Sequence, residues 1–193
     1  MRQSAAVPIL IALVSATLIA SQKEQLFPHT KKSGKATVEY RHEGFYVVVN
    51  YDYSQRNHSA AWLLIDVAMA SKTRFVAHRD DFSLVTPEGR PLKLPTQQGV
   101  SADSPALMSL AQNSKIHRQN LEGYFSQRSV REILNFYSSP FEHAISDEAI
   151  VDNDRVTMGA LLFKSPEGRW PEGTYRLAID NEKAQAALPI ALQ

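Results

Sequence analysis

Hydrophobic and polar residues alternate with a period of two along much of the chain, which predicts β-strands. Val38 and Tyr40 face one way between polar neighbours, and residues 45–53 form a run of aromatic and β-branched side chains typical of a strand. The apolar run 60–70 lies between strand-like neighbours, so we predict that it is a central strand. Further short strands are predicted at residues 73–76, 81–85, 91–94, 148–151, 156–163, 174–179 and 186–192.

The hydrophobic period changes to that of a helix in the middle of the chain. Ser104 and Pro105 suit a helix start, and apolar residues then recur at helical spacing, with Gly123 as the stop. A second helix is predicted over 129–137, where Ser129 opens a capping-box pattern and an apolar stripe follows at helical spacing, formed by Val130, Ile133, Leu134 and Tyr137. These residues also include strand formers, so a strand is the alternative. The chain therefore carries a block of helical character at about 104–137.

Turn signals separate the predicted strands. Residues 82–90 and 161–169 are similar stretches, and each ends in a proline- and glycine-containing turn. Many short strands punctuated by turns, with helices confined to one block, favour an antiparallel β-sandwich. A parallel βαβ architecture would need strands and helices to alternate. We therefore predict one mainly β domain over 36–193, with a helical insertion at about 104–137.

The amino-terminal segment is typical of export. Residues 5–20 contain no charge, follow Arg2, and form a run shorter than the ~20 residues that cross a bilayer as a helix. We predict a secretory signal over 1–20 that is cleaved after Ala20. Leu18 occupies a position where a small residue is preferred, so an uncleaved membrane anchor is the alternative. Residues 21–35 are predicted to be a polar linker.

The amino-acid composition excludes several kinds of functional site. The 193 residues include no cysteine, which excludes disulfides, thiol nucleophiles and thiolate metal sites. The 21 Lys and Arg residues nearly balance the 20 Asp and Glu residues, so no overall positive field favours nucleic acid. Stability must come from a hydrophobic core.

The carboxyl-terminal strands carry a recurring pattern of core and turn positions. Its residues are Gly159, Leu161, Phe163, Pro166, Gly173, Tyr175 and Leu177. This pattern resembles the final hairpin of exported bacterial immunoglobulin-like modules of uncharacterised function. The resemblance implies an antiparallel immunoglobulin-like β-sandwich with a binding or structural role, and it brings no catalytic residues and no cofactor. The helical block departs from such a minimal module.

The helical block is locally basic and contains aromatic residues, which favours recognition of a partner. A solvated helix face is the alternative. Trp170 lies in a loop, where it could anchor a partner if exposed or pack against the edge of the sandwich. The predicted binding residues are Lys115, Arg118, Tyr124, Arg128, Arg131 and Trp170.

Two other clusters bear on chemistry. His78, Arg79, Asp80 and Asp81 place an imidazole beside two carboxylates in one connection, where a histidine could act as a general base. The simpler interpretation is a charged turn. Acidic residues between 147 and 154 offer oxygen ligands for calcium, but their spacing does not match an EF-hand loop and suits a turn. We assign no catalytic residue, metal ligand or cofactor.

Together these patterns predict an exported, non-enzymatic envelope protein, periplasmic or secreted, that binds a protein or a surface component. Nucleic acid is not an expected partner, and the membrane is one only through residues 5–20 if they are retained. The alternative function is a metal-dependent or hydrolytic enzyme with a site assembled from distant residues around His78.

Overall fold

The computed structural model describes residues 27–116, 119–125, 130–137 and 147–193. These residues form a mainly β structure, and no helix among them is both long and apolar enough to cross a membrane. The predicted signal segment 1–20 lies outside the described residues. The strands are β1 (Thr30–Lys32), β2 (Thr37–His42), β3 (Phe45–Asn50), β4 (Trp62–Ser71), β5 (Phe75–His78), β6 (Phe82–Val85), β7 (Pro91–Lys93), β8 (Val130–Leu134), β9 (Glu148–Val151), β10 (Arg155–Lys164), β11 (Gly173–Asn181) and β12 (Ala184–Leu192). The helices are α2 (Asp52–Arg56), α3 (Gln97–Ala102) and α4 (Ser104–Ser114), with 3-10 turns η1 (Arg79–Asp81) and η2 (Leu121–Phe125).

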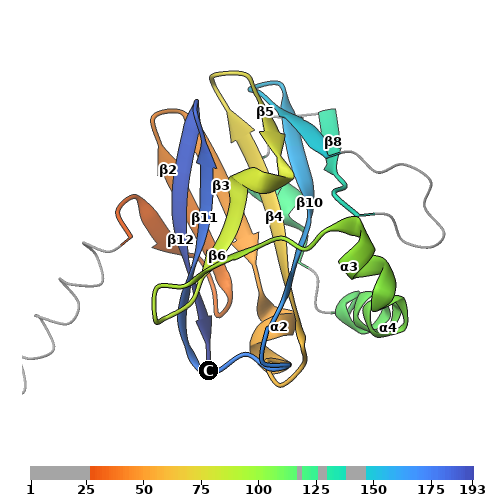
Figure 1. Ribbon diagram of the computed structural model, residues 1–193. Helices are drawn as coiled ribbons and strands as arrows, with labels where there is room; N and C mark the ends of the chain where they lie inside the picture. The colour runs from red at the N-terminus through yellow and green to blue at the C-terminus, as the bar shows by residue number, and fades with distance from the viewer. Residues whose placement is uncertain (1–26, 117–118, 126–129, 138–146) are drawn as a thin grey trace, which may run out of the picture.

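The strands form two larger sheets and one short ribbon (Figure 1). One sheet has the order β1-β2-β3-β4-β10-β8, and the other has the order β12-β11-β6-β7. Strand β5 pairs with β9 in the ribbon, and η1 connects β5 directly to β6. All neighbours are antiparallel except β8 and β10, which are parallel.

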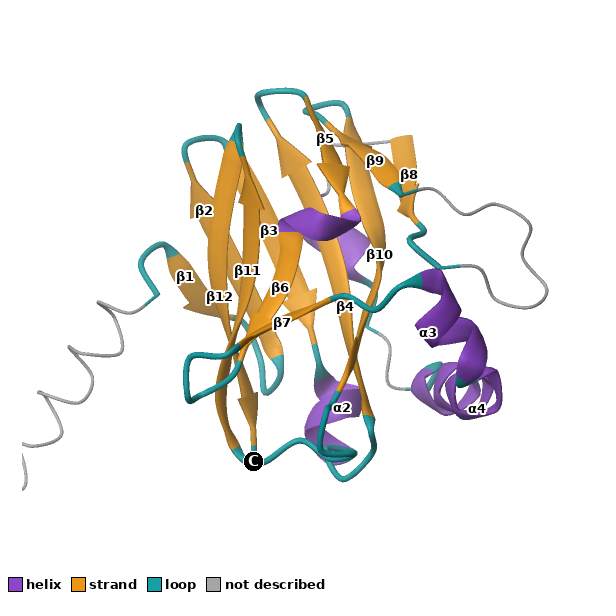
Figure 2. Ribbon diagram, in the orientation of Figure 1, coloured by secondary structure: helices purple, strands orange, loops and turns teal. Residues whose placement is uncertain are grey.

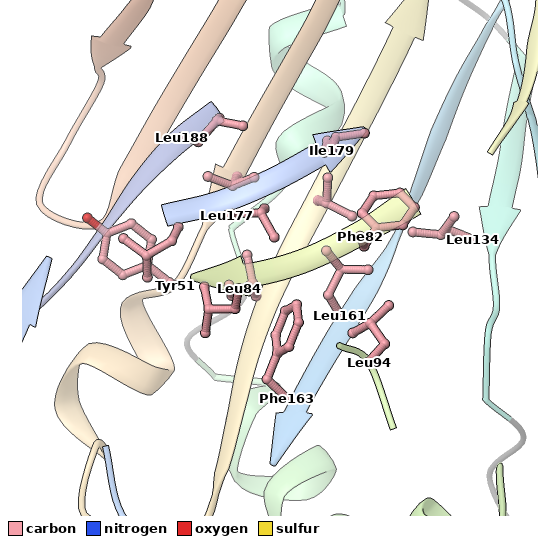
Figure 3. Packing of buried hydrophobic residues seen from close by; sticks show 14 of the residues in the cluster. Tyr51, Phe82, Leu84, Leu94, Leu134, Leu161, Phe163, Leu177, Ile179 and Leu188 are labelled. Atoms are coloured by element: carbon pink, nitrogen blue, oxygen red, sulfur yellow. The ribbon is translucent and has the colours of Figure 1, made fainter. Parts of the chain in front are cut away.

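The two larger sheets share one hydrophobic core (Figure 3). Leu161 and Phe163 of β10 contribute from the six-stranded sheet, and Phe82, Leu84 and Leu177 contribute from the four-stranded sheet. These five side chains are fully buried. Their burial removes enough apolar surface from water to stabilise a domain without disulfides.

The residues between β7 and β10 cross from the four-stranded sheet to the far side of the six-stranded sheet (Figure 2). We call residues 97–134, as far as they are described, the crossover segment. It begins with α3 and α4, continues through η2, and ends in β8 at the sheet edge. Leu121 and Phe125 of η2 pack on the outer face of the six-stranded sheet, against Tyr46, Val48, Ala68, Ala70 and Val156. The first half of the predicted helical block is therefore helical. Its second half consists of η2, which covers the sheet, and β8, which forms the sheet edge.

The predicted helix over 129–137 is wrong, because residues 130–134 form strand β8. Val130 and Ile133, which the helical pattern placed in a buried stripe, are 50% and 74% exposed. Leu134 and Phe136 are buried instead, and their spacing of two residues is the period of a strand. The parallel pairing with β10 outweighs the local helical pattern.

Three other boundaries differ from the sequence predictions. Residues 30–32, assigned to a linker, pair with β2 as strand β1. The strand predicted over 45–53 ends at Asn50, and α2 follows. Ser54 explains this change, because its hydroxyl donates to the carbonyl of Leu64 at 2.8 Å and accepts from the Leu64 amide at 2.7 Å. The helix that was expected to stop at Gly123 ends at Ser114.

The two similar turns form as predicted. Gly89 and Gly168 adopt positive φ values of 87° and 75°, which favour glycine. The turns also touch, because Nη2 of Arg90 lies 3.6 Å from Oε1 of Glu167. This exposed ion pair links the end of β6 to the end of β10.

Candidate recognition surface

The crossover segment is anchored to the sandwich at three places. The first anchor holds its helices, through a polar contact and an apolar one. The Asp103 carboxylate accepts a hydrogen bond from Trp62 Nε1 at 3.1 Å and pairs with Lys164 Nζ at 2.6 Å. Val100, Leu107 and Leu110 enter the main core. The bond to Lys164 is the main reason that the pKa of Asp103 lies below its ordinary value, with a smaller contribution from Trp62.

Asp103 therefore predicts an acid-sensitive contact. The carboxylate stabilises the folded state fully above the ordinary aspartate pKa, and this contribution is lost as the pH falls through the lower pKa of the folded protein. We expect a shift of tryptophan fluorescence and faster proteolysis within 97–116 over that window. An Asp103→Asn protein should show the loosened state already at neutral pH.

The matched control for this prediction is Asp80→Asn, since the Asp80 side chain is 86% exposed and its ion-pair partner is the neighbouring Arg79, at 4.0 Å. Its fluorescence and proteolysis should follow the wild type. Equal behaviour of both variants would show that Asp103 does not hold the helices in place.

The second anchor is the small apolar cluster under η2. The Phe125 and Tyr46 rings lie 4.7 Å apart between centroids. Tyr46 is itself fixed, because its hydroxyl donates to Glu39 Oε2 at 2.7 Å and the Arg41 guanidinium lies 4.2 Å from its ring centre. Burial, followed by the contact with Glu39, raises the pKa of Tyr46 to about 12, so it remains a neutral donor at physiological pH.

The third anchor is strand β8, whose two charged side chains are paired within the molecule. Arg131 donates to both carboxylate oxygens of Glu122, at 2.7 and 2.5 Å. Arg155 Nη1 donates to Glu132 Oε2 at 3.0 Å. The charges on this strand are therefore already compensated.

Exposed apolar side chains are concentrated on the crossover segment. Among the described residues, four of the five large hydrophobic side chains that are exposed lie on it, and the fifth is on β5. They are Met108, Ile116, Val130 and Ile133, with Val76 on β5. Ile116 is 86% exposed just after α4. The sequence interpretation missed the exposed pair on β8, because it assigned both residues to a buried helical stripe.

The structure does not gather the described members of the predicted basic set, Lys115 and Arg131, into one free face. Lys115 is exposed immediately after α4, whereas Arg131 lies on β8 with its charge paired to Glu122. Tyr124 is partly buried and packs against the cluster under η2. Arg118 and Arg128 lie outside the described residues. Among the residues predicted to bind, Lys115 thus keeps the clearest access to a partner.

Trp170 is buried, which corrects its selection as a binding residue. It is 3% exposed and packs edge-on against Tyr175, with ring centroids 5.6 Å apart. Its backbone amide donates to the carbonyl of His58 at 2.8 Å, which holds the loop against the sandwich. The alternative of packing at the edge of the sandwich is the correct one.

The His78 cluster forms a surface turn. The Asp81 carboxylate accepts from the His78 amide at 2.9 Å and from Asn181 Nδ2 at 2.8 Å, so it fixes the turn. The His78 ring lies 3.6 Å from Glu148, and both side chains are about half or more exposed. These contacts match the charged-turn interpretation and do not bring the imidazole and two carboxylates into a buried site.

The acidic residues near 147–154 are engaged by cations and amides of the protein. Asp152 pairs with Arg155 Nε at 2.9 Å and accepts from the amides of Asp154 and Arg155. Asp147 lies 3.6 Å from Arg79. Among the described residues, no group of three or more His, Asp or Glu side chains is placed to hold a metal ion.

Comparison of the chain with models of protein families, with curated proteins and with solved structures finds no match.

Proposed function

We propose that this chain is an exported, non-enzymatic binding module that recognises a protein or surface component of the cell envelope. The observation that carries the proposal is the concentration of exposed apolar side chains on the crossover segment. Contiguous exposed apolar surface on a folded domain marks an interaction site, and the proposal is that these side chains of the crossover segment contribute to one. The segment is also held to the sandwich by three anchors, so its surface is ordered before a partner arrives.

We further propose that the sandwich has immunoglobulin-like topology. Strands β4 and β10 are neighbours in one sheet. Strand β6, which follows β4 after the ribbon strand β5, and strand β11, which follows β10, are neighbours in the other. In an immunoglobulin domain, strands B and E are related to strands C and F in this way. The sheet β12-β11-β6-β7 then corresponds to strands G, F and C with one added edge strand. The parallel pairing of β8 with β10 departs from this pattern.

Export is proposed from the uncharged run at residues 5–20, which follows Arg2. The envelope is then the compartment that supplies the partner. If residues 5–20 are retained instead of cleaved, the same module would be held at the membrane surface.

Cross-linking in cells tests both parts of the proposal. A photoreactive amino acid at position 116 is expected to capture an envelope component, while one at Lys183, in the exposed β11–β12 turn, captures none. Mass spectrometry of the same purified protein should show a mature chain that begins at Ser21. Cross-links formed equally from positions 116 and 183, or a protein found only in the cytoplasm, would contradict the proposal. Lys115→Glu is expected to weaken capture from position 116, because Lys115 is its exposed neighbour.

A further inference from the structure

Strand β8 is the edge of the six-stranded sheet. Among the described strands, only β10 pairs with it, over residues 130–134. An edge strand presents backbone N–H and C=O groups that can pair with another chain. Proteins commonly protect such edges with charged side chains, proline or a very short strand.

The side chains of β8 leave this edge apolar. Ile133 is 74% exposed and Val130 is 50% exposed, and they lie on opposite faces because side chains alternate along a strand. Ile133 is opposite Met158, which is partly buried against the cluster under η2. The exposed apolar surface therefore continues from the outer face of the sheet to its edge.

The two charged side chains of β8 are paired within the molecule, and that of Arg131 is still 62% exposed. Arg131 is paired with Glu122 and Glu132 with Arg155, so each already has an opposite charge within the molecule. A charged side chain on an added strand would therefore meet no unpaired opposite charge at Arg131 or Glu132. The edge thus matches a strand with neutral side chains.

We propose that β8 accepts an extended, uncharged and apolar segment of a partner protein as an additional strand. This inference rests on the proposed binding function and names the kind of partner. The main-chain groups of the edge would supply the hydrogen bonds, and Val130 and Ile133 would contact alternate side chains of the added strand.

A second copy of this chain fits the same edge less well. Two antiparallel β8 strands related by a two-fold axis pair residue with residue about a central position. When the centre is Glu132 or Arg131, each of these residues faces its own counterpart, and like charges directly opposite are destabilising. When the centre is Ile133, Glu132 faces the buried apolar Leu134.

The test uses the ¹⁵N-labelled protein as it is purified from cells and a capped six-residue peptide of alternating threonine and valine. We expect concentration-dependent changes of amide shifts in β8 and β10. A peptide with lysine in place of threonine should bind at least about tenfold more weakly, and so should the Ile133→Lys protein with the neutral peptide. Thr174→Lys is the control, because it places the same charge at an exposed strand residue of the other sheet, outside the crossover segment, and its binding should equal that of the wild type.

Three results would overturn the inference: equal binding of both peptides, equal binding by Ile133→Lys, or shift changes outside β8 and β10. A chain that is dimeric alone and monomeric as Ile133→Lys would also overturn it, in favour of a second copy. Capture from position 116 that survives in Ile133→Lys, together with no peptide binding, would leave the proposed function standing and remove only this inference. Loss of all capture from position 116 in the wild type would remove the proposed function itself.

Discussion

The Phe125→Ala protein is expected to lose about 3–5 kcal/mol of unfolding free energy, which is the usual cost of removing a fully buried aromatic ring. Phe125 is 1% exposed and fills the cluster between η2 and the outer face of the six-stranded sheet. Its ring contacts Tyr46, so alanine leaves a cavity beside that ring. Loss of the contact should also free η2 from the sheet.

Urea unfolding followed by circular dichroism measures this effect. The control is Ile116→Ala, which removes an equally apolar but exposed side chain of the same segment and should change stability by no more than about 0.5 kcal/mol. A loss below about 1 kcal/mol for Phe125→Ala would mean that η2 does not contribute a second core.

The strands with strong patterns were predicted well. The run 60–70 became β4, and the alternating residues 174–179 lie within β11. Both are long, and both place apolar residues where the pairing of the two sheets buries them. For such elements the local pattern and the tertiary environment agree, so the sequence alone is sufficient to predict the strand.

The crossover segment was predicted poorly, because its structure depends on surfaces that are distant in sequence. Residues 129–137 have helical spacing, yet β10 offers a sheet edge that converts them to a strand. The role of η2 was not visible either, since Phe125 is buried only because the outer face of β3 and β4 is apolar. Long-range pairing outweighed local preference at both places.

Dependence on surfaces that are distant in sequence also explains why the candidate site was only partly predicted. Recognition was assigned to this stretch of chain through basic residues, but the charge of Arg131 proved to be used inside the molecule. Trp170 was chosen because it stands in a loop, although its loop folds back over Tyr175. Exposure of Val130 and Ile133 could be recognised only once β8 was known to be an edge strand.

Gly159 connects this edge to the rest of the sheet, and Gly159→Ala is the second large effect that we expect. A Cβ atom at this position would lie 2.1 Å from the Leu134 carbonyl oxygen and 2.7 Å from its Cβ, distances that no relaxed structure allows. Since Gly159 is opposite Leu134 in the parallel ladder, the carboxyl end of β8 must move away from β10. We expect a loss of about 1–3 kcal/mol, the usual cost of overpacking, together with loss of protection in β8.

Urea unfolding and hydrogen exchange of the β8 amides measure the two effects together. Gly123→Ala is the matched control, because no other atom lies within 4 Å of a Cβ at that position and its stability should change by no more than about 0.5 kcal/mol. If Gly159→Ala leaves β8 protected while Gly123→Ala also has no effect, then the edge strand does not depend on the close approach at Gly159. If β8 is released as expected, the threonine–valine peptide should lose its binding site as well, because the strand that would pair with it no longer forms part of the sheet.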